Sequence, residues 1–135
     1  MDITYRVYAA GEGWQAWAQG GQVAGDIDKD GQVEAIQLKL VDAPEIVGVQ
    51  YRAHVAGHGW REWVMDGETA GMPGQALYVE AFEVRLLGAP HWSVVYQAHI
   101  EEIGWQGWAA DGAAAGTLGQ GRALQGARFV IARRP

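Results

Sequence analysis

Apolar and polar residues alternate with a period of two in three separate stretches of the chain. In the clearest of them, 51–55, Tyr, Ala and Val alternate with Arg and His, and the stretches 5–9 and 96–100 follow the same pattern. Because successive side chains of a strand point to opposite faces, each stretch predicts a strand with one buried face.

A second alternating pattern follows each of these strands about thirty residues later. In 82–86, Phe, Val and Leu alternate with Glu and Arg, and 36–40 and 127–131 repeat the pattern. Val79 and Phe82 are both apolar across an odd spacing, which predicts a β-bulge near Glu80 and Ala81. The pattern therefore predicts a long strand, preceded by a bulge, at the end of each repeated unit.

The motif Gly-Trp-x-x-Trp lies between these strands and occurs three times. The copies begin at Gly13, Gly59 and Gly104, roughly 45 residues apart, which is a repeat period. We interpret each copy as one strand. Asp66-Gly67 and Asp111-Gly112 then predict β-hairpins, because glycine accepts the positive φ that such turns require. A short strand leading to an Ala-Gly pair completes four strands per repeat.

Each repeat closes at a proline, so the boundaries are about 1–44, 45–90 and 91–135. One repeat cannot bury its apolar face alone, and we therefore expect a single all-β domain over 1–135 with pseudo-threefold symmetry. Two architectures fit four-stranded repeats. In a β-trefoil the first and last strands build a six-stranded barrel, and in a β-prism each repeat forms its own sheet. The short link from each long last strand into the next first strand favours the trefoil, with the prism as the alternative.

The paired tryptophans are the first candidate binding residues. Positions three apart on a strand point to opposite faces, so the two tryptophans of a copy should diverge. Small residues accompany the first tryptophan of each copy, which favours the core for that set, and a partly exposed position for the second. An exposed ring beside polar groups suits a sugar, although all six rings could instead be core. The predicted platform comprises Trp17, Trp63 and Trp108 with Gln15, Arg61 and Gln106.

Acidic and amide side chains form a second set of candidates. Asp66 and Asp111 either bind ligand or serve the chemistry of their turns. Glu34, Glu80 and Gln125 occupy the predicted bulge, where they either bind ligand hydroxyls or satisfy the backbone that the bulge frees.

One acidic stretch in the first repeat resembles the opening of a calcium loop. Asp26, Asp28 and Asp30 stand at alternate positions before Gly31, but Gln37 replaces the bidentate glutamate of such loops. Calcium is therefore a weak candidate against the simpler interpretation of an acidic turn. We predict no other metal or cofactor.

Composition and charge exclude several classes of function. The net charge is −6 and the basic residues are scattered, which argues against nucleic-acid binding. There is no cysteine, and no apolar run is long enough to insert into a membrane. The N-terminus has no signal-peptide pattern, which indicates a cytoplasmic protein or a trimmed piece of a larger one. No catalytic motif is present, so we do not expect an enzyme. The oligomeric state is left open.

The repeat resembles the clostridial hydrophobic repeat with its tryptophan signature (ChW). The first repeat departs from the pattern at Tyr8, Gly20 and Asp28-Lys29, and the third departs at Gln125. The matching residues in the other repeats are Tyr51, His54, Gly59, Trp60, Trp63, Asp66, Gly67, Ala70, Gly71, Gly74, Gln75, Glu80 and Tyr96 through Gly119-Gln120.

The resemblance implies a secreted or surface-displayed bacterial protein that binds polysaccharide or another surface partner. Together with the tryptophans, it predicts a non-catalytic, lectin-like carbohydrate-binding module with up to three equivalent shallow sites. The alternative is a protein–protein interaction or adhesion module. A sugar site should recur in every repeat, whereas a protein-docking patch need occupy only one side.

Overall fold

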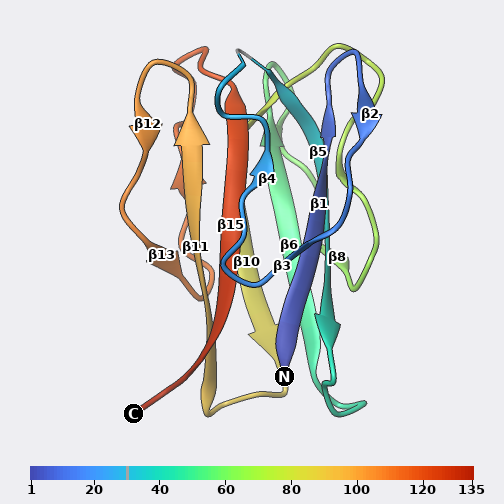
Figure 1. The fold of residues 1–135 in the computed structure, drawn as a ribbon, viewed down its shortest axis with the longest axis vertical. Helices are drawn as coiled ribbons and strands as arrows, with labels where there is room; N and C mark the ends of the chain where they lie inside the picture. The colour runs from blue at the N-terminus through green and yellow to red at the C-terminus, as the bar shows by residue number, and fades with distance from the viewer. Residues whose placement is uncertain (30) are drawn as a thin grey trace.

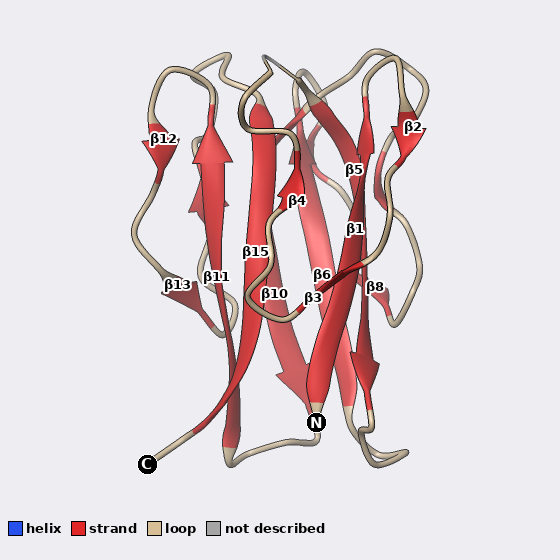
Figure 2. Ribbon diagram, viewed as in Figure 1, coloured by secondary structure: helices blue, strands red, loops and turns tan. Residues whose placement is uncertain are grey.

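The chain folds entirely into strands and turns. The computed structural model describes residues 1–29 and 31–135, which form fifteen β-strands and no helix (Figures 1 and 2). It follows that no described segment is a helix able to cross a membrane. The prediction of an all-β chain built from three repeats is confirmed.

Six long strands form the body of the molecule and run along its long axis (Figure 1). The first and last strands of each repeat pair with each other in an antiparallel ladder. These pairs are β1 (Asp2–Ala9) with β5 (Val33–Val41), β6 (Gly48–Val55) with β10 (Val79–Leu87), and β11 (Trp92–Ile100) with β15 (Leu124–Arg133).

Three short strands lie between the long strands of each repeat, so a repeat has five strands rather than the predicted four. They are β2 (Gly13–Trp14), β3 (Ala18–Gln19) and β4 (Ala24–Gly25); β7 (Gly59–Trp60), β8 (Val64–Met65) and β9 (Ala70–Gly71); and β12 (Gly104–Trp105), β13 (Ala109–Ala110) and β14 (Ala115–Gly116). The Gly-Trp-x-x-Trp motif is two strands because it is interrupted after its first tryptophan.

The core lies between the three sheets and is made by the inward faces of the long strands. The alternation of 51–55 is confirmed, since Tyr51, Ala53 and Val55 are fully buried and the residues between them are not. The predicted bulge is also confirmed, because the ladder skips Glu80 as it passes from Val79 to Ala81. The same shift occurs in the other two repeats.

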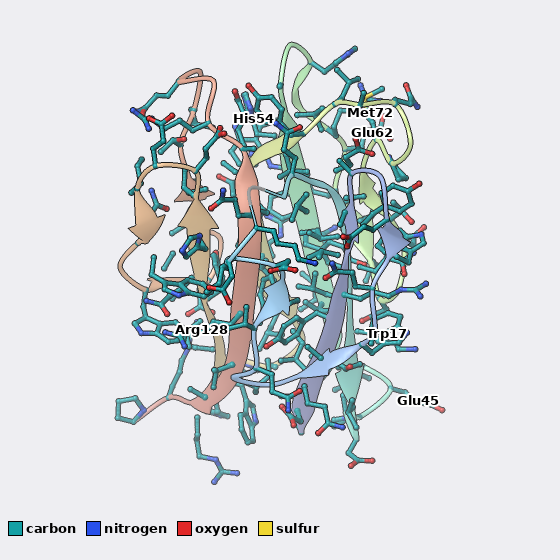
Figure 3. All side chains as sticks on the ribbon, turned by 45° about the horizontal axis from the view of Figure 1, so that its top comes forward. Trp17, Glu45, His54, Glu62, Met72 and Arg128 are labelled. Atoms are coloured by element: carbon teal, nitrogen blue, oxygen red, sulfur yellow. The ribbon has the colours of Figure 1, made fainter. Side chains whose placement is uncertain are left out.

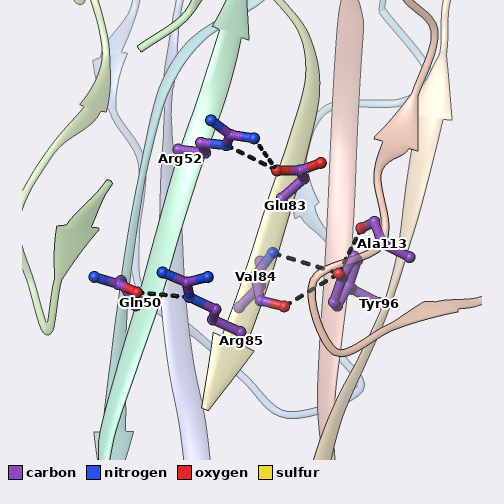
Figure 4. Close-up of polar contacts among 7 residues, drawn as sticks. All are labelled: Gln50, Arg52, Glu83, Val84, Arg85, Tyr96 and Ala113. Atoms are coloured by element: carbon purple, nitrogen blue, oxygen red, sulfur yellow. Dashed lines mark hydrogen bonds and ion pairs between the residues drawn. The ribbon is translucent and has the colours of Figure 1, made fainter. Parts of the chain in front are cut away.

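A tyrosine at the start of each alternating stretch joins the core to the turns around it. Tyr51 donates its hydroxyl hydrogen to the carbonyl of Glu68, and Tyr96 donates to Ala113 at 2.6 Å. Tyr96 also reaches Val84 in the neighbouring sheet (Figure 4). Burial raises the pKa of Tyr51 and of Tyr96 to about 12, because the ionised form would lose its hydration.

The sheets are linked by an exchange of short strands around the molecule. The Ala-Gly strand of each repeat pairs with the last long strand of another repeat: β9 with β5, β14 with β10, and β4 with β15. We call each of these junctions between neighbouring sheets a seam. The turn at Asp66-Gly67 does have positive φ at both residues, as predicted. The predicted hairpin is wrong, however, because the flanking strands β8 and β9 pair in different sheets, and this turn instead carries the chain across a seam.

The backbone ladders do not form the six-stranded barrel on which the preference for the trefoil was based. Within residues 1–29 and 31–135 the ladders make three separate sheets, and none joins the long strands of neighbouring repeats directly. The physical reason is visible at β4, which lies between β15 and β1 and takes up part of that junction (Figure 1). Each of the three sheets contains the two long strands of one repeat and one short strand of another.

Candidate functional site

Both tryptophans of each motif lie on the outer face of a sheet, which corrects the prediction that they face opposite ways. On β6, Trp60 lies opposite His54, and Val64 lies opposite Tyr51. Three residues separate Trp60 from Val64, whereas two separate Tyr51 from His54. The segment between β7 and β8 therefore has one extra residue, which bulges opposite Arg52. An extra residue reverses the alternation, and Trp63 therefore joins Trp60 on the outer face.

An arginine lies between the two rings of each pair. The Cζ atom of Arg52 is 4.6 Å from the ring centre of Trp60 and 4.7 Å from that of Trp63. We call this arrangement the Trp–Arg–Trp cluster. Its other copies are Trp14, Arg6 and Trp17, and Trp105, Arg128 and Trp108. Trp17 and Arg128 mark two of the clusters on different sides of the molecule (Figure 3). Neither set of rings belongs to the buried core.

The central arginines were not among the predicted site residues. Arg52 donates to Glu83 on the paired strand at 2.7 Å (Figure 4). In the third repeat the two roles are exchanged between strands, so that Arg128 of β15 donates to Gln97 of β11 at 2.6 Å. The sequence signal is a basic residue at an outward position opposite an amide or acid, and it has to be sought on either strand.

The exposure of the second tryptophan depends on a second cation. Arg85 covers Trp63 at 4.0 Å, and Trp63 is only partly exposed. Lys39 covers Trp17 at 4.4 Å, and that ring is 37% exposed. Val130 occupies the equivalent position in the third repeat, where Trp108 is 52% exposed. The three clusters therefore present unequal aromatic surfaces.

A histidine or tyrosine extends each cluster towards the bulge. His54 meets Trp60 edge to face at 5.2 Å, and its Nδ1 lies 2.9 Å from the Oε2 of Glu80. The ring N–H is not directed at that oxygen. His99 makes the same contacts with Trp105 and Gln125. These histidines are packed side chains of the outer face.

The three bulge residues are buried, and two of them bind backbone across the seams. Glu34 and Glu80 are each 4% exposed and accept hydrogen bonds from Gly74 and Gly119, which belong to the following repeats. Gln125 is equally hidden. The backbone that the bulge frees is satisfied as well, since the carbonyl of Glu80 accepts from Thr117 at 3.1 Å. These contacts favour the structural alternative for Glu34 and Glu80.

The carboxylates of the two turn aspartates also accept hydrogen bonds from backbone amides. Asp66 and Asp111 accept from the amides of Val49 and Val94, each at 3.0 Å, near the start of a long strand. The first repeat has Gly20 in place of this aspartate. There, the carboxylate of Asp2 accepts from the backbone amide of Ile3 at 2.7 Å instead. The Oδ1 atom of Asp2 occupies the place where a side chain at position 20 would begin. The same interaction is thus made from a different place in the sequence.

In the third repeat the residue after the first tryptophan faces a seam rather than the exposed ring, which corrects the predicted place of Gln106 on the platform. Gln106 bonds both backbone groups of Gly116, accepting from its amide at 2.7 Å and donating to its carbonyl at 3.3 Å. Gln15 instead donates to Glu12 at 3.3 Å. Arg61 is exposed and lines a cleft of about 310 Å³ at the corresponding seam.

The calcium hypothesis gains no ligand set from the described residues. Asp26 forms an ion pair with Lys29 at 3.5 Å, and Asp30 lies outside the described residues. Among residues 1–29 and 31–135, no three histidine, aspartate or glutamate side chains come together to hold a metal ion. Calcium binding stays a prediction.

Comparison with known proteins identifies the repeat. The family described as Clostridial hydrophobic W matches residues 8–42, 54–88 and 99–131. Each match contains one Gly-Trp-x-x-Trp motif and the bulge that follows it. No curated protein and no solved structure matches the chain. The family covers well over half of the sequence in three successive copies, and the chain belongs to the Clostridial hydrophobic W family.

Proposed function

We propose that the chain is a non-catalytic carbohydrate-binding module of the lectin type, with shallow sites on the outer faces of its sheets. The observation that carries the proposal is the exposed second tryptophan, at 52% for Trp108 and 37% for Trp17. An exposed indole face can stack on the C–H groups of a sugar ring, and neighbouring cations and amides can bond its hydroxyls.

The sites should differ in strength from repeat to repeat. At Trp108 a sugar meets an indole with one arginine beside it, at 5.2 Å. At Trp63 it would have to displace Arg85, which covers the ring at 4.0 Å. We therefore rank the site at Trp108 first, the site at Trp17 second and the site at Trp63 last.

The arrangement of the sheets supports binding to a repeating polymer. Three sheets around one core point three clusters in different directions, so weak single sites can act together on a polysaccharide surface. The separate sheets favour a prism type of architecture over a trefoil. We also propose that the target lies outside the cell, on the basis of the family resemblance.

A protein-docking or adhesion role is the second candidate, and the apolar end of the molecule favours it. Ile46 is 81% exposed and Val41 is 39% exposed. Beside Ile46 lies a cleft of about 390 Å³ whose lining also includes Pro90 and Trp92. None of the residues that line this cleft belongs to a Trp–Arg–Trp cluster.

A glycan array screened with the purified domain, in calcium and in chelator, tests the proposal. Trp108→Ala should remove most of the binding while the fold stays intact. Val130→Arg is the sharper variant, because it places beside Trp108 the cation that Arg85 places over Trp63. The indole of Trp108 stays in place. The variant should weaken binding in the same direction. Wild-type binding that neither variant changes would place the site elsewhere, and no binding to soluble or polymeric glycans would favour protein docking. Loss of binding in chelator would support the calcium loop.

A further inference from the structure

The cleft at the seam between the first and second repeats has a backbone edge as one wall. It is lined by Trp60, Arg61, Glu62, Val64 and the segment 69–71, with a volume of about 310 Å³. The segment 69–71 includes β9, the short strand that pairs with β5. The opposite wall is the chain that follows β7.

The amide and carbonyl of Gly71 point into this cleft. Met72 donates its amide hydrogen to the carbonyl of Glu34 on β5 at 3.1 Å. Backbone groups of successive residues in a strand point to alternate edges. The two groups of Gly71, which neighbours Met72, therefore face away from β5 and towards Trp60 and Arg61.

The third repeat shows which chemical group fits such an edge. There, the carboxamide of Gln106 accepts from the amide of Gly116 and donates to its carbonyl, at 2.7 and 3.3 Å. Gln97 in turn donates to the backbone carbonyl of Gln106 at 2.8 Å, which fixes this segment. The occupant is a planar group with an acceptor and a donor on one side.

The second repeat supplies no such group of its own. Arg61 stands at the position of Gln106, and a guanidinium has donors but no acceptor, so it cannot take the amide hydrogen of Gly71. In the described part of the chain the Arg61 side chain makes no hydrogen bond and is exposed. The donor and acceptor of Gly71 are left facing the cleft.

We propose that this cleft binds a primary carboxamide, namely the side chain of a glutamine or asparagine supplied by a partner polypeptide. A primary carboxamide carries an N–H on the same side as its oxygen and can bond both groups of Gly71 at once. A trans secondary amide has its N–H and oxygen on opposite sides and can bond only one. A carboxylate can accept but not donate, and Glu62 beside the cleft would repel it.

The test is a titration of ¹⁵N-labelled protein with propionamide, followed through the amide resonance of Gly71. The matched control ligand is N-methylpropionamide, which has a similar apolar part but no N–H on the side of its oxygen. Because one hydrogen bond is lost, we expect the control to bind roughly tenfold more weakly. This test does not depend on any sugar, so it can fail while the proposed carbohydrate binding holds, or the reverse.

Two variants make the result specific to this edge. Gln15, which has Arg6 in place of Gln97, bonds Glu12 instead of the neighbouring edge, so the variant has to copy both glutamines of the third repeat. Arg61→Gln combined with Arg52→Gln should fill the cleft from within, as Gln106 does, and abolish the response of Gly71 to propionamide. Gln106→Ala should open the equivalent cleft and create a new response at Gly116. The proposal is overturned if Gly71 does not respond to propionamide, if both ligands shift it equally, or if the double variant leaves the response unchanged.

Discussion

Gly71 is one of three equivalent glycines, with Gly25 and Gly116, whose replacement should damage the fold severely, because each lies where two sheets approach each other. Its φ is +115°, and a Cβ at this position would lie 2.4 Å from the carbonyl oxygen of Glu34 and 2.8 Å from the Cα of Ala35. Both neighbours are backbone atoms of β5, which cannot rotate away. In Gly71→Ala, β9 would therefore have to move away from β5.

The size of the effect follows from this geometry. Carbon atoms pack at about 3.5 Å or more, so β9 would have to retreat by about 1 Å. The unusual φ alone costs about 1–3 kcal/mol. The retreat also weakens the bonds from Met72 to Glu34, at 3.1 Å, and from Gly67 to Leu38, at 2.7 Å. At about 1 kcal/mol for each, the free energy of unfolding should fall by about 3–5 kcal/mol. Domains are typically stable by about 5–15 kcal/mol, so this loss is severe.

Urea unfolding followed by tryptophan fluorescence measures the loss, and Gly57→Ala is the matched control. Gly57 also has positive φ, at +76°, but no atom lies within 4 Å of its Cβ position. The control should lose only the cost of a left-handed backbone, about 1–2 kcal/mol. The reasoning is refuted if Gly71→Ala is no less stable than Gly57→Ala.

Two further predictions concern the tyrosines and the clusters. Since the pKa of Tyr51 is raised to about 12 in the folded protein, its stabilising effect is complete below its ordinary pKa of 10.0. That stability should be lost as the pH rises from about 10 to about 12; urea midpoints measured against pH should fall less steeply in Tyr51→Phe. Arg128→Gln should cost about 1–2 kcal/mol of stability through lost cation–π contacts, and adding Gln97→Arg should restore it, since the first two repeats carry the arginine on that strand. Thermal unfolding of the single and double variants checks this, and a double variant no more stable than Arg128→Gln would contradict it.

The features that the sequence predicts well are those that depend on periodicity. The long strands and the bulge at Glu80 follow from apolar spacing, because a buried face repeats every second residue and a bulge interrupts that rhythm. The turn at Asp66-Gly67 follows from the φ values that its residues accept. In each of these cases the physical cause lies within a few residues along the chain.

The tryptophan faces and the strand exchange could not be predicted in this way. Trp63 joins Trp60 because an extra residue is inserted opposite Arg52, and residues 61–63 carry no apolar alternation that would reveal it. The partner of β9 is β5, in another repeat, and a two-residue strand has too little pattern to specify a distant partner. Arg128 was missed because its role moves to the opposite strand in the third repeat.

The three seams have the same strand pairing, but the residues that they join are separated by different lengths of chain. Two seams join residues about 35 positions apart, whereas the pairing of Gly25 with Gly126 closes a loop of about 100 residues. The entropy lost on loop closure grows with the logarithm of length, which makes this seam about 1 kcal/mol harder to close. Loop-closure entropy therefore favours an order of assembly in which the two shorter seams close before the contact between β4 and β15 forms.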